Sequence, residues 1–380
     1  MTDPTIDRVE TVCLEAPLEE PFGYAQEWVD RRTATLVRIE TVDGTVGWGE
    51  CWGPIAGTRE AVTDFFAPRL EGNSVQAVNG TYDALYDAAR AAYQSIVPLP
   101  ALSGIDIALW DLWGNYLGES VASLLGGRRR ERVDAYATGH YFKPVDSLDE
   151  QFSRISAEAE TNFEALGAVK LKLGLAIAGY GPEADIELVD RVRKRLGDAA
   201  TIMVDANYAY DRPTAEEVGR QLADRDIRWF EEPVRPEDIE GYATLCEILS
   251  VPVAGGECHT SAEVRRLLEI GGLDIVQPDV CNFGGLTPAH RIAEHLAGDH
   301  RAQLIPHVWG TPVALGASLQ LIASLPTETM LEFDRSPNPL REEIAEQPIT
   351  ADRDGCVAIP DCPGIGVDLD ESAIERYRIA

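Results

Sequence analysis

Polar and apolar residues alternate along the first 50 positions with the two-residue period of half-buried β-strands. The alternation runs through RVETVCLEA, TATLVRIET and TVGWGE, and the turn residues Val42, Asp43 and Gly44 lie between the last two segments. Alternating segments joined by an Asp-Gly turn are typical of a hairpin. We therefore expect an antiparallel hairpin with a third strand beside it.

A helical period replaces this alternation in SGIDIALWDLWGNYLG, residues 103–118. Its apolar face consists of Ile105, Ala108, Leu109 and Leu112. Ser103 and Asp106 have the spacing of a capping box, which predicts that the helix begins at Ser103. Together, the strands and helices predict an α+β domain over residues 1–128.

From Val133 onward, short apolar runs alternate with helical stretches, and the strand-helix unit repeats every 22 to 36 residues. The eight runs are VDAYATG, VKLKLG, TIMVDAN, IRWFEEP, VPVAGGE, LDIVQPD, AQLIPHVW and ETMLEF. This repetition favours a parallel (β/α) barrel over residues 129–335, although a doubly wound open sheet has the same pattern. Residues 336–380 contain Pro-rich turns and are expected to pack back on the first domain.

The charge balance is strongly acidic, because 33 Lys plus Arg against 64 Asp plus Glu gives 33 − 64 = −31. Nucleic acids and anionic membranes are therefore poor partners. Only four of the basic residues are lysines, which is typical of the acidic surfaces of halophilic proteins; an ordinary acidic enzyme is the alternative. The N-terminus lacks a basic segment and an apolar run, so we expect a protein that is neither secreted nor membrane-spanning.

The seven cysteines are scattered singly and include no CxxC pair. An odd, dispersed set does not suggest a disulfide framework. We therefore expect a reducing, cytoplasmic environment and no zinc site.

Ionisable residues stand at the ends of most predicted barrel strands, where the active sites of such barrels lie. They are Lys170, Lys172, Asp205, Glu231, Glu232, Glu257, Asp279, His307 and Glu332. Singly, each is more often a helix cap or a solvated loop residue. Their shared position makes a common site the stronger interpretation.

Three of these carboxylates, Asp205, Glu231 and Glu257, are spaced 26 residues apart, one strand-helix unit per step. They should converge from adjacent strands, and converging carboxylates stay ionised only around a cation. Oxygen ligands with positions left for water or substrate favour one Mg²⁺ ion. Asn207 and Glu232 are candidates for supporting the ligands.

Two of the four lysines, Lys170 and Lys172, lie two residues apart and so point to the same face of their strand. Each should lower the pKa of the other, which leaves a neutral amine available as a base. An exposed edge strand with paired lysines is the alternative.

His307 and Asp279 end neighbouring predicted strands, so the carboxylate could orient the imidazole, although a lone core histidine is the alternative. Glu332 lies in the apolar run ETMLEF, where desolvation could keep it protonated.

The ordered series GWGE, ALSGIDIALWD, KxK, DAN, EEP, GGE, the Asp–His pair, the final Glu and IPDCPGIGV resembles the mandelate racemase and muconate lactonizing enzyme family of the enolase superfamily. The resemblance implies a modified (β/α)₇β barrel with an N-terminal α+β capping domain completed by the C-terminal segment. It places the Mg²⁺ ligands on Asp205, Glu231 and Glu257, and the base on Lys172 with Lys170 beside it. It also implies a His307–Asp279 dyad, an electrophilic acid at Glu332 and a homo-oligomer.

The family's shared chemistry is removal of a proton α to a carboxylate to form an enolate. Segments such as YATGHY and IPHVWGTPV are most similar to members that cycloisomerise an aldaro-lactone of galactarolactone type to a 3-deoxy-2-keto-hexarate. The alternatives are an acid-sugar dehydratase, then a racemase or epimerase, and, in a different class, a non-catalytic metal- or sugar-acid-binding barrel. Tyr24, Trp52 and His140 are candidate contacts to a small acid sugar or its lactone.

Overall fold

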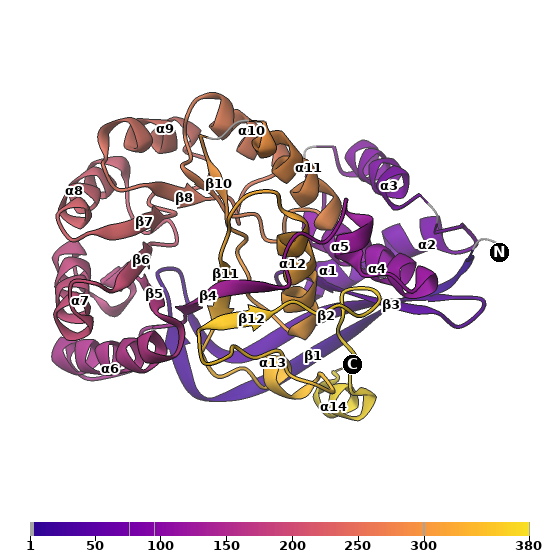
Figure 1. The fold of residues 1–380 in the computed structure, drawn as a ribbon, viewed down its shortest axis with the longest axis horizontal. Coiled ribbons are helices and arrows are strands. Elements are labelled where there is room, and N and C mark those ends of the chain that lie inside the picture. Colours follow the sequence, from indigo (N-terminus) through magenta and orange to yellow (C-terminus); the bar gives the residue numbers. More distant parts are fainter. Residues whose placement is uncertain (1–3, 76, 95, 299–300, 380) are drawn as a thin grey trace.

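The computed structural model describes residues 4–75, 77–94, 96–298 and 301–379. It contains a three-stranded antiparallel sheet and a curled, mainly parallel sheet surrounded by helices (Figure 1). The curled sheet carries the strand ends on which the predicted site residues lie, and the antiparallel sheet packs beside it.

The antiparallel sheet has the order β1-β2-β3, and each of its strands arises from one of the three alternating segments. The strands are β1 (Ile6–Gly23), β2 (Trp28–Thr41) and β3 (Val46–Cys51). The β2–β3 hairpin turns at Val42–Thr45, as the sequence predicts. The helices that follow are α1 (Ile55–Glu60), η1 (Ala61–Phe66), α2 (Ala67–Leu70), α3 (Val78–Tyr93), α4 (Leu99–Leu117) and α5 (Val121–Leu124).

All eight predicted barrel runs form strands, and their order in the sheet is β10-β9-β8-β7-β6-β5-β4-β11. They are β4 (Arg132–Thr138), β5 (Ala168–Lys172), β6 (Thr201–Asp205), β7 (Ile227–Glu231), β8 (Val253–Gly255), β9 (Ile275–Val276), β10 (Gln303–Leu304) and β11 (Leu331–Asp334). Neighbours are parallel throughout this path. An unbroken order of sequential parallel strands is a barrel-type sheet, which excludes the doubly wound alternative.

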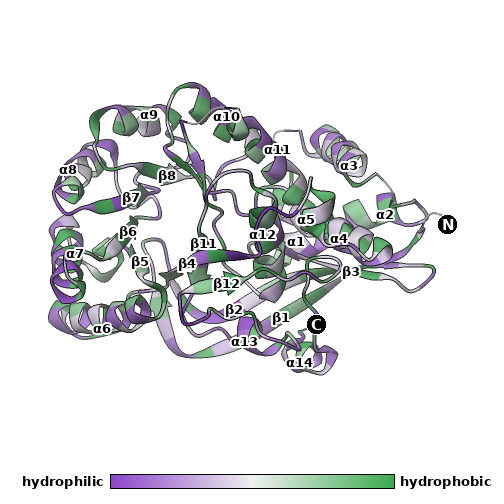
Figure 2. Ribbon diagram, in the orientation of Figure 1, coloured by the Kyte–Doolittle hydropathy of each residue, from purple (hydrophilic) through white to green (hydrophobic). Residues whose placement is uncertain are grey.

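A helix follows each of the first seven barrel strands, whereas the last strand is followed only by a short helix. The helices are α6 (Leu148–Leu166), η2 (Leu175–Ala178) with α7 (Pro182–Leu196), α8 (Arg212–Ala223), α9 (Ile239–Ile248), α10 (Ser261–Glu269), α11 (Leu286–Ala297) and α12 (Pro312–Ser324). The fold is therefore the modified (β/α)₇β barrel with its capping domain. Figure 2 shows hydrophilic residues concentrated on the outer faces of helices such as α7 and hydrophobic residues toward the sheet.

The C-terminal segment contributes α13 (Pro339–Glu343), β12 (Cys356–Ala358) and α14 (Glu371–Tyr377). Helices α13 and α14 pack on β1, and α13 also packs on β2, so the segment completes the capping domain. Strand β12 instead pairs antiparallel with β4 of the barrel. The division at residues 128 and 335 stays a proposal; it falls between α5 and β4, and directly after β11.

The predicted capping box at Ser103 is wrong, because α4 begins at Leu99 and both residues lie inside the helix. Their buried side chains instead bond the start of α11, in the barrel. Ser103 Oγ accepts from the backbone N–H of Gly284 at 2.8 Å, and Asp106 accepts from the N–H and the hydroxyl of Thr287 at 2.8 and 2.7 Å. Ser103 and Asp106 therefore join the capping domain to the barrel by hydrogen bonds, and they do not cap α4.

None of the helices in the described part of the chain combines the length and apolar character needed to cross a membrane.

Candidate active site

A cavity of about 630 Å³ lies where the carboxyl ends of the barrel strands face the capping domain. The barrel contributes Lys172, Asn207, Glu257 and His307 to its lining. The capping domain contributes Tyr24 and Trp52 from the loops after β1 and β3. The structure thus brings six of the sequence-predicted residues to one cavity.

Lys170 and Lys172 point into the barrel from β5, as the two-residue period requires, and both are buried. Lys170 Nζ lies 2.5 Å from Glu231 Oε1 and 2.7 Å from Glu332 Oε1. Lys172 Nζ donates to Asp205 Oδ2 at 2.5 Å and to Asn207 Oδ1 at 3.0 Å. The exposed-edge alternative is therefore excluded.

The expected mutual lowering of the two lysine pKa values is not what the surroundings produce. Burial lowers the pKa of Lys170, but Glu231 and Glu332 outweigh burial and hold that pKa well above its usual range. Burial likewise lowers the pKa of Lys172, and Asp205 outweighs it and raises that pKa. Repulsion between the two ammonium groups is real but small beside these carboxylates, so both lysines are protonated in this arrangement.

Asp205 and Glu231 lie side by side at the ends of β6 and β7, in register across the sheet. Burial raises the pKa of Asp205, but Lys172 and Lys170 outweigh it and lower that pKa. For Glu231 burial prevails over Lys170 and raises the pKa to about 7. The lysines thus compensate for the burial of Asp205 but not for that of Glu231, so the Glu231 carboxylate would favour an added cation.

Two residues that were not anticipated hold Glu231. Trp229 Nε1 and Gln277 Nε2 donate to Glu231 Oε2 at 2.9 and 2.7 Å. Trp229 precedes Glu231 by two residues within β7, so the two side chains share a strand face, and this period could have identified Trp229. Gln277 lies just after the end of β9, where the strand period does not apply.

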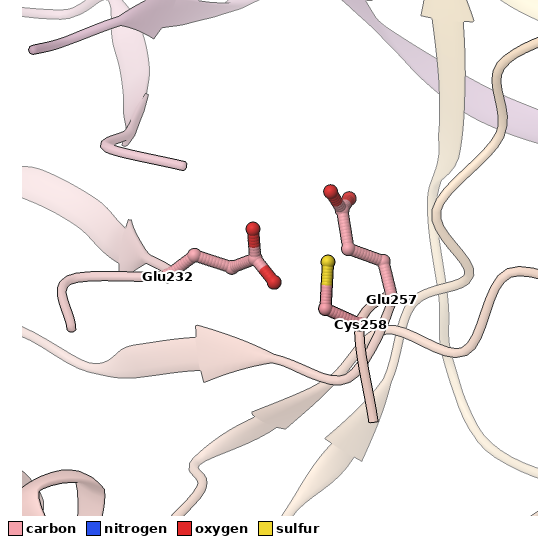
Figure 3. A group of neighbouring side chains, drawn as sticks. All are labelled: Glu232, Glu257 and Cys258. Carbon is pink, nitrogen blue, oxygen red and sulfur yellow. The ribbon is translucent and has the colours of Figure 1, made fainter. Parts of the chain in front are cut away.

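Glu232 contributes two buried oxygens, Oε1 and Oε2, that accept no hydrogen bond among the described residues. Glu257 Oε2 likewise accepts none that meets the geometry of a hydrogen bond, but it lies 3.0 Å from Nε2 of His307 as an ion-pair contact. Figure 3 shows Glu232 and Glu257 approaching each other from two different strand ends, with Cys258 between them. Buried unpartnered carboxylate oxygens are what a hard divalent cation would satisfy, so this donor set fits a metal ion.

His307 lies in the loop after β10, and its ring is held from both sides. Its Nδ1 lies 2.6 Å from Asp279 Oδ2, and its Nε2 lies 3.0 Å from Glu257 Oε2. Burial lowers the pKa of His307, but Glu257, Glu332 and Asp279 outweigh burial and raise the pKa to about 10. The imidazole is therefore charged near neutral pH and bonded to the partner that the sequence predicts.

Glu332 is not kept protonated, contrary to expectation. Burial raises its pKa, but Lys170, followed by His307 and Lys172, outweighs burial and lowers the pKa below its usual range. The sequence shows the apolar neighbours of Glu332 along β11 but not the three cations across the barrel. In this arrangement Glu332 is a carboxylate that helps to keep Lys170 charged.

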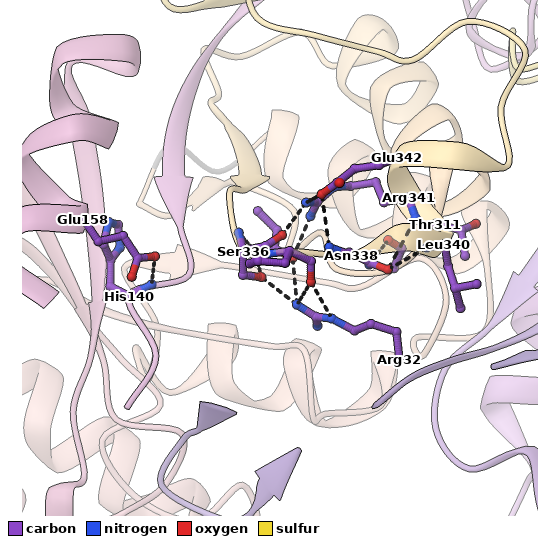
Figure 4. Close-up of polar contacts among 12 residues, drawn as sticks. Arg32, His140, Glu158, Thr311, Ser336, Asn338, Leu340, Arg341 and Glu342 are labelled. Carbon is purple, nitrogen blue, oxygen red and sulfur yellow. Dashed lines mark hydrogen bonds and ion pairs between the residues drawn. The ribbon is translucent and has the colours of Figure 1, made fainter. Parts of the chain in front are cut away.

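The candidate substrate contacts separate into two groups. Tyr24 and Trp52 line the cavity, and the Trp52 ring stands edge-on to His307 with 5.6 Å between ring centroids. His140 lies outside the cavity lining and is fully buried, with Nδ1 2.8 Å from the carbonyl of Lys170 and Nε2 3.1 Å from Asn162. Figure 4 shows its backbone bonded to Glu158, so the structure places His140 in the wall behind the lysine strand.

The cavity wall between the two domains is built around Arg32, which is buried. Its guanidinium lies 4.6 Å from the ring centroid of Phe22 and 4.7 Å from that of Trp309, and both rings line the cavity. Arg32 also donates to Ser336 and to the carbonyl of Pro337, from the segment after β11 (Figure 4). Arg32 therefore ties the capping sheet to the barrel at the edge of the site.

The capping loop also bonds the barrel directly. Gln26 Nε2 donates to the carbonyl of Asn207 at 2.6 Å, and Asn207 has the left-handed backbone φ of +40°. The barrel, its buried lysines and carboxylates, and a capping loop over the strand ends together define an enolase-type site.

Two family models match the chain. Residues 7–126 match the mandelate racemase/muconate lactonizing enzyme N-terminal domain, and residues 154–373 match the enolase C-terminal domain-like family. The chain therefore belongs to the mandelate racemase/muconate lactonizing enzyme family of the enolase superfamily, and it is an enzyme of that superfamily.

Similar proteins span nearly the whole chain. D-Galactarolactone cycloisomerase of Agrobacterium fabrum is 40% identical, covering 98% of this chain and 99% of that protein. Arabinonate dehydratase of Saccharolobus solfataricus is 31% identical, covering 98% of each chain. The crystal structure of 3,6-anhydro-D-galactonate cycloisomerase from Zobellia galactanivorans is 34% identical with a TM-score of 0.87, covering 99% of this chain and 100% of that one.

Proposed function

We propose that this protein is a Mg²⁺-dependent cycloisomerase that opens an aldaro-lactone of galactarolactone type to a 3-deoxy-2-keto-hexarate. The observation that carries the proposal is that Lys172 and His307 line one cavity from strand ends separated by β6 to β9 in the sheet. Two cationic acid-base groups can thus act on different sides of one substrate. The cycloisomerases among its relatives favour the lactone as that substrate.

The ligands proposed for the ion are Asp205, Glu231 and Glu257. A divalent cation held there would supply localised positive charge to the substrate carboxylate as its α proton leaves, and would draw the charge of Asp205 away from Lys172. Trp229 and Gln277 orient Glu231, and Asn207 orients Lys172.

Lys172 is proposed as the base. Among the described residues, Asp205 does most to hold the proton on Lys172, and the two groups lie 2.5 Å apart. An ion that engaged Asp205 would weaken this hold and lower the pKa of Lys172. Lys172 takes the proton α to the substrate carboxylate, and Lys170, charged and fully buried, stabilises the negative charge that develops.

The β oxygen of the substrate belongs to the lactone ring. When its bond to the β carbon breaks, the ring opens and the oxygen leaves as part of a second carboxylate. His307 then supplies a proton to the β carbon, and the enol hydroxyl releases its own proton as the enol becomes the ketone. Counted as free acids, substrate and product contain the same atoms, so the reaction is an isomerisation.

An acid-sugar dehydratase is the second candidate. In an open acid sugar the same step expels hydroxide, which needs a proton donor, and the charged His307 is suited to that role. Arabinonate dehydratase, similar over 98% of this chain, favours the same alternative.

Proton NMR in D₂O separates the two candidates. The protein with Mg²⁺ is mixed with a panel of aldonates, aldarates and their lactones. Conversion of a lactone to a keto acid supports the first proposal, and conversion of open acid sugars alone supports the second. Deuterium exchange without product would indicate a racemase or epimerase.

Variants test the assigned roles. Lys172→Ala and His307→Ala should each lower turnover by roughly 10²–10⁴-fold, the usual worth of a positioned acid or base. Calorimetry should still detect Mg²⁺ binding in both. Lys194→Ala, an exposed lysine at the end of α7, is the matched control and should turn over normally. Unchanged rates in Lys172→Ala would refute the assignment of the base.

A further inference from the structure

Three ligand-type side chains meet beside the proposed Mg²⁺ ligands. One carboxylate oxygen of Glu232, one of Glu257 and Sγ of Cys258 all lie within 4.8 Å of one another. Figure 3 shows the Glu232 carboxylate directed from the end of β7 toward the Cys258 sulfur and Glu257. Three donors at such separations can reach a single ion placed among them.

Glu232 points into this cluster, where the thiol of Cys258, a weak donor, faces it. Glu232 is 0% exposed, and neither of its carboxylate oxygens has a hydrogen-bond partner within the described ranges. The nearby lysines are engaged elsewhere, because Lys170 bonds Glu231 and Lys172 bonds Asp205. A buried carboxylate without a bond is costly, so its position indicates a ligand that the protein atoms do not supply.

We propose that Glu232, Glu257 and Cys258 bind a thiophilic divalent cation, of which Zn²⁺ is the representative. Carboxylate oxygen and thiolate sulfur are both zinc ligands in proteins, and with three of them water would complete a four-coordinate site. Mg²⁺ prefers oxygen donors alone, whereas a sulfur ligand favours zinc and cobalt. The sulfur therefore distinguishes this site from the proposed Mg²⁺ site.

A cation can reach these residues through the substrate cavity. Cys258 and Glu257 both line the cavity, and Cys258 is exposed, whereas Glu232 lies behind them. The sequence-based expectation of no zinc site rested on the lack of a CxxC pair. That criterion does not detect a site in which one cysteine joins two glutamates from different strand ends.

The two proposed sites share the carboxylate of Glu257, so Zn²⁺ and Mg²⁺ compete for it. Zn²⁺ held by Glu232 and Cys258 engages the carboxylate that the proposed Mg²⁺ site requires. We expect Zn²⁺ to weaken Mg²⁺ binding, and Mg²⁺ in excess to weaken Zn²⁺ binding. The inference rests on the proposed Mg²⁺ ligand set only for this competition; binding of the thiophilic ion itself is measured without substrate.

Cobalt reports the sulfur ligand directly, because Co²⁺ bound to a thiolate absorbs in the near ultraviolet. Metal-free protein titrated with Co²⁺ should develop this band to one equivalent, and Zn²⁺ should abolish it. Cys258→Ser should lack the band, and Glu232→Gln should weaken Co²⁺ binding by at least about 10-fold. Cys362→Ser, which removes an exposed cysteine in the C-terminal segment, is the matched control and should keep the band.

A measurement on the unaltered chain complements the variants. Zn²⁺ should protect Cys258 from alkylation, as read by peptide mass, and should leave Cys362 reactive. The proposal is overturned if the cobalt band is absent, if it survives in Cys258→Ser, or if Zn²⁺ leaves alkylation of Cys258 unchanged. Loss of Mg²⁺-dependent turnover with the cobalt band intact would count against the proposed function alone.

Discussion

Ser103 allows the strength of the junction between the capping domain and the barrel to be measured. The residue lies inside α4, is fully buried, and accepts a hydrogen bond from the backbone N–H of Gly284, just before α11. Ser103→Ala removes this acceptor and leaves a buried N–H group without its bond. The change is small in volume, so the effect isolates one contact across the junction.

The expected cost follows from two opposing contributions. An unsatisfied buried N–H costs about 1–3 kcal/mol. Alanine favours the interior of a helix over serine by about 0.5 kcal/mol, which offsets part of that cost. The free energy of unfolding should therefore fall by about 0.5–2.5 kcal/mol.

Ser156 provides the matched control. It also lies buried inside a helix, α6, but its hydroxyl has no hydrogen-bond partner among the described residues. Ser156→Ala should leave the free energy of unfolding unchanged or raise it by up to about 1 kcal/mol. Urea denaturation followed by circular dichroism compares the two variants. Equal effects of both substitutions would refute the contribution assigned to the Ser103–Gly284 bond.

Three further substitutions test packing and charge. Gly49→Ala should cost at least about 3 kcal/mol, because its Cβ would lie 1.9 Å from the carbonyl oxygen of Gly104; normal expression and an unchanged melting temperature would contradict this. Gly80→Ala, in α3, should stabilise by up to about 1 kcal/mol in the same melting assay, since the nearest side-chain atom that its Cβ would meet among the described residues is Cβ of Ala77 at 3.8 Å; a loss of stability would contradict this. Asp334→Asn should cost about 3 kcal/mol at neutral pH because it breaks a buried ion pair with Arg341 at 2.7 Å. Burial raises the pKa of Asp334, but Arg341 and Arg32 outweigh burial and lower that pKa below 3.8, the value expected in the unfolded chain. The stabilisation from the ion pair is therefore fully present above pH 3.8 and is lost as the pH falls through the pKa of Asp334 in the folded protein. The difference in urea midpoint between the wild type and Asp334→Asn should therefore become smaller in acid. A difference that does not change with pH would contradict the stabilisation assigned to the ion pair.

The barrel strands were predictable because each is a short buried run between longer helical segments, and burial on both faces leaves that composition in the sequence. The start of α4 was not predictable, because Ser103 and Asp106 have the spacing of a capping box but accept hydrogen bonds at the start of α11 instead. A local pattern indicates that a polar side chain accepts a hydrogen bond from the backbone, whereas only the tertiary contacts show which backbone N–H donates it.

The sequence also allowed the prediction that side chains at the strand ends lie close together, but it did not reveal the protonation states of those side chains. Lys172 and His307 reach one cavity as expected. Their charges depend on carboxylates from other strands, which no spacing reveals. His140 was assigned to the substrate from its position after β4, yet the left-handed backbone there turns it toward Asn162.

The pairing of β1 with the last described residues has a consequence for biosynthesis. Cys13 accepts a hydrogen bond from the N–H of Ile379, and Leu14 forms a bridge with Arg378. In vectorial synthesis, the first strand leaves the ribosome long before these partners exist. One edge of the capping sheet therefore stays unpaired until the whole barrel has been translated. During that time the nascent chain exposes this strand edge to chaperones and to neighbouring chains.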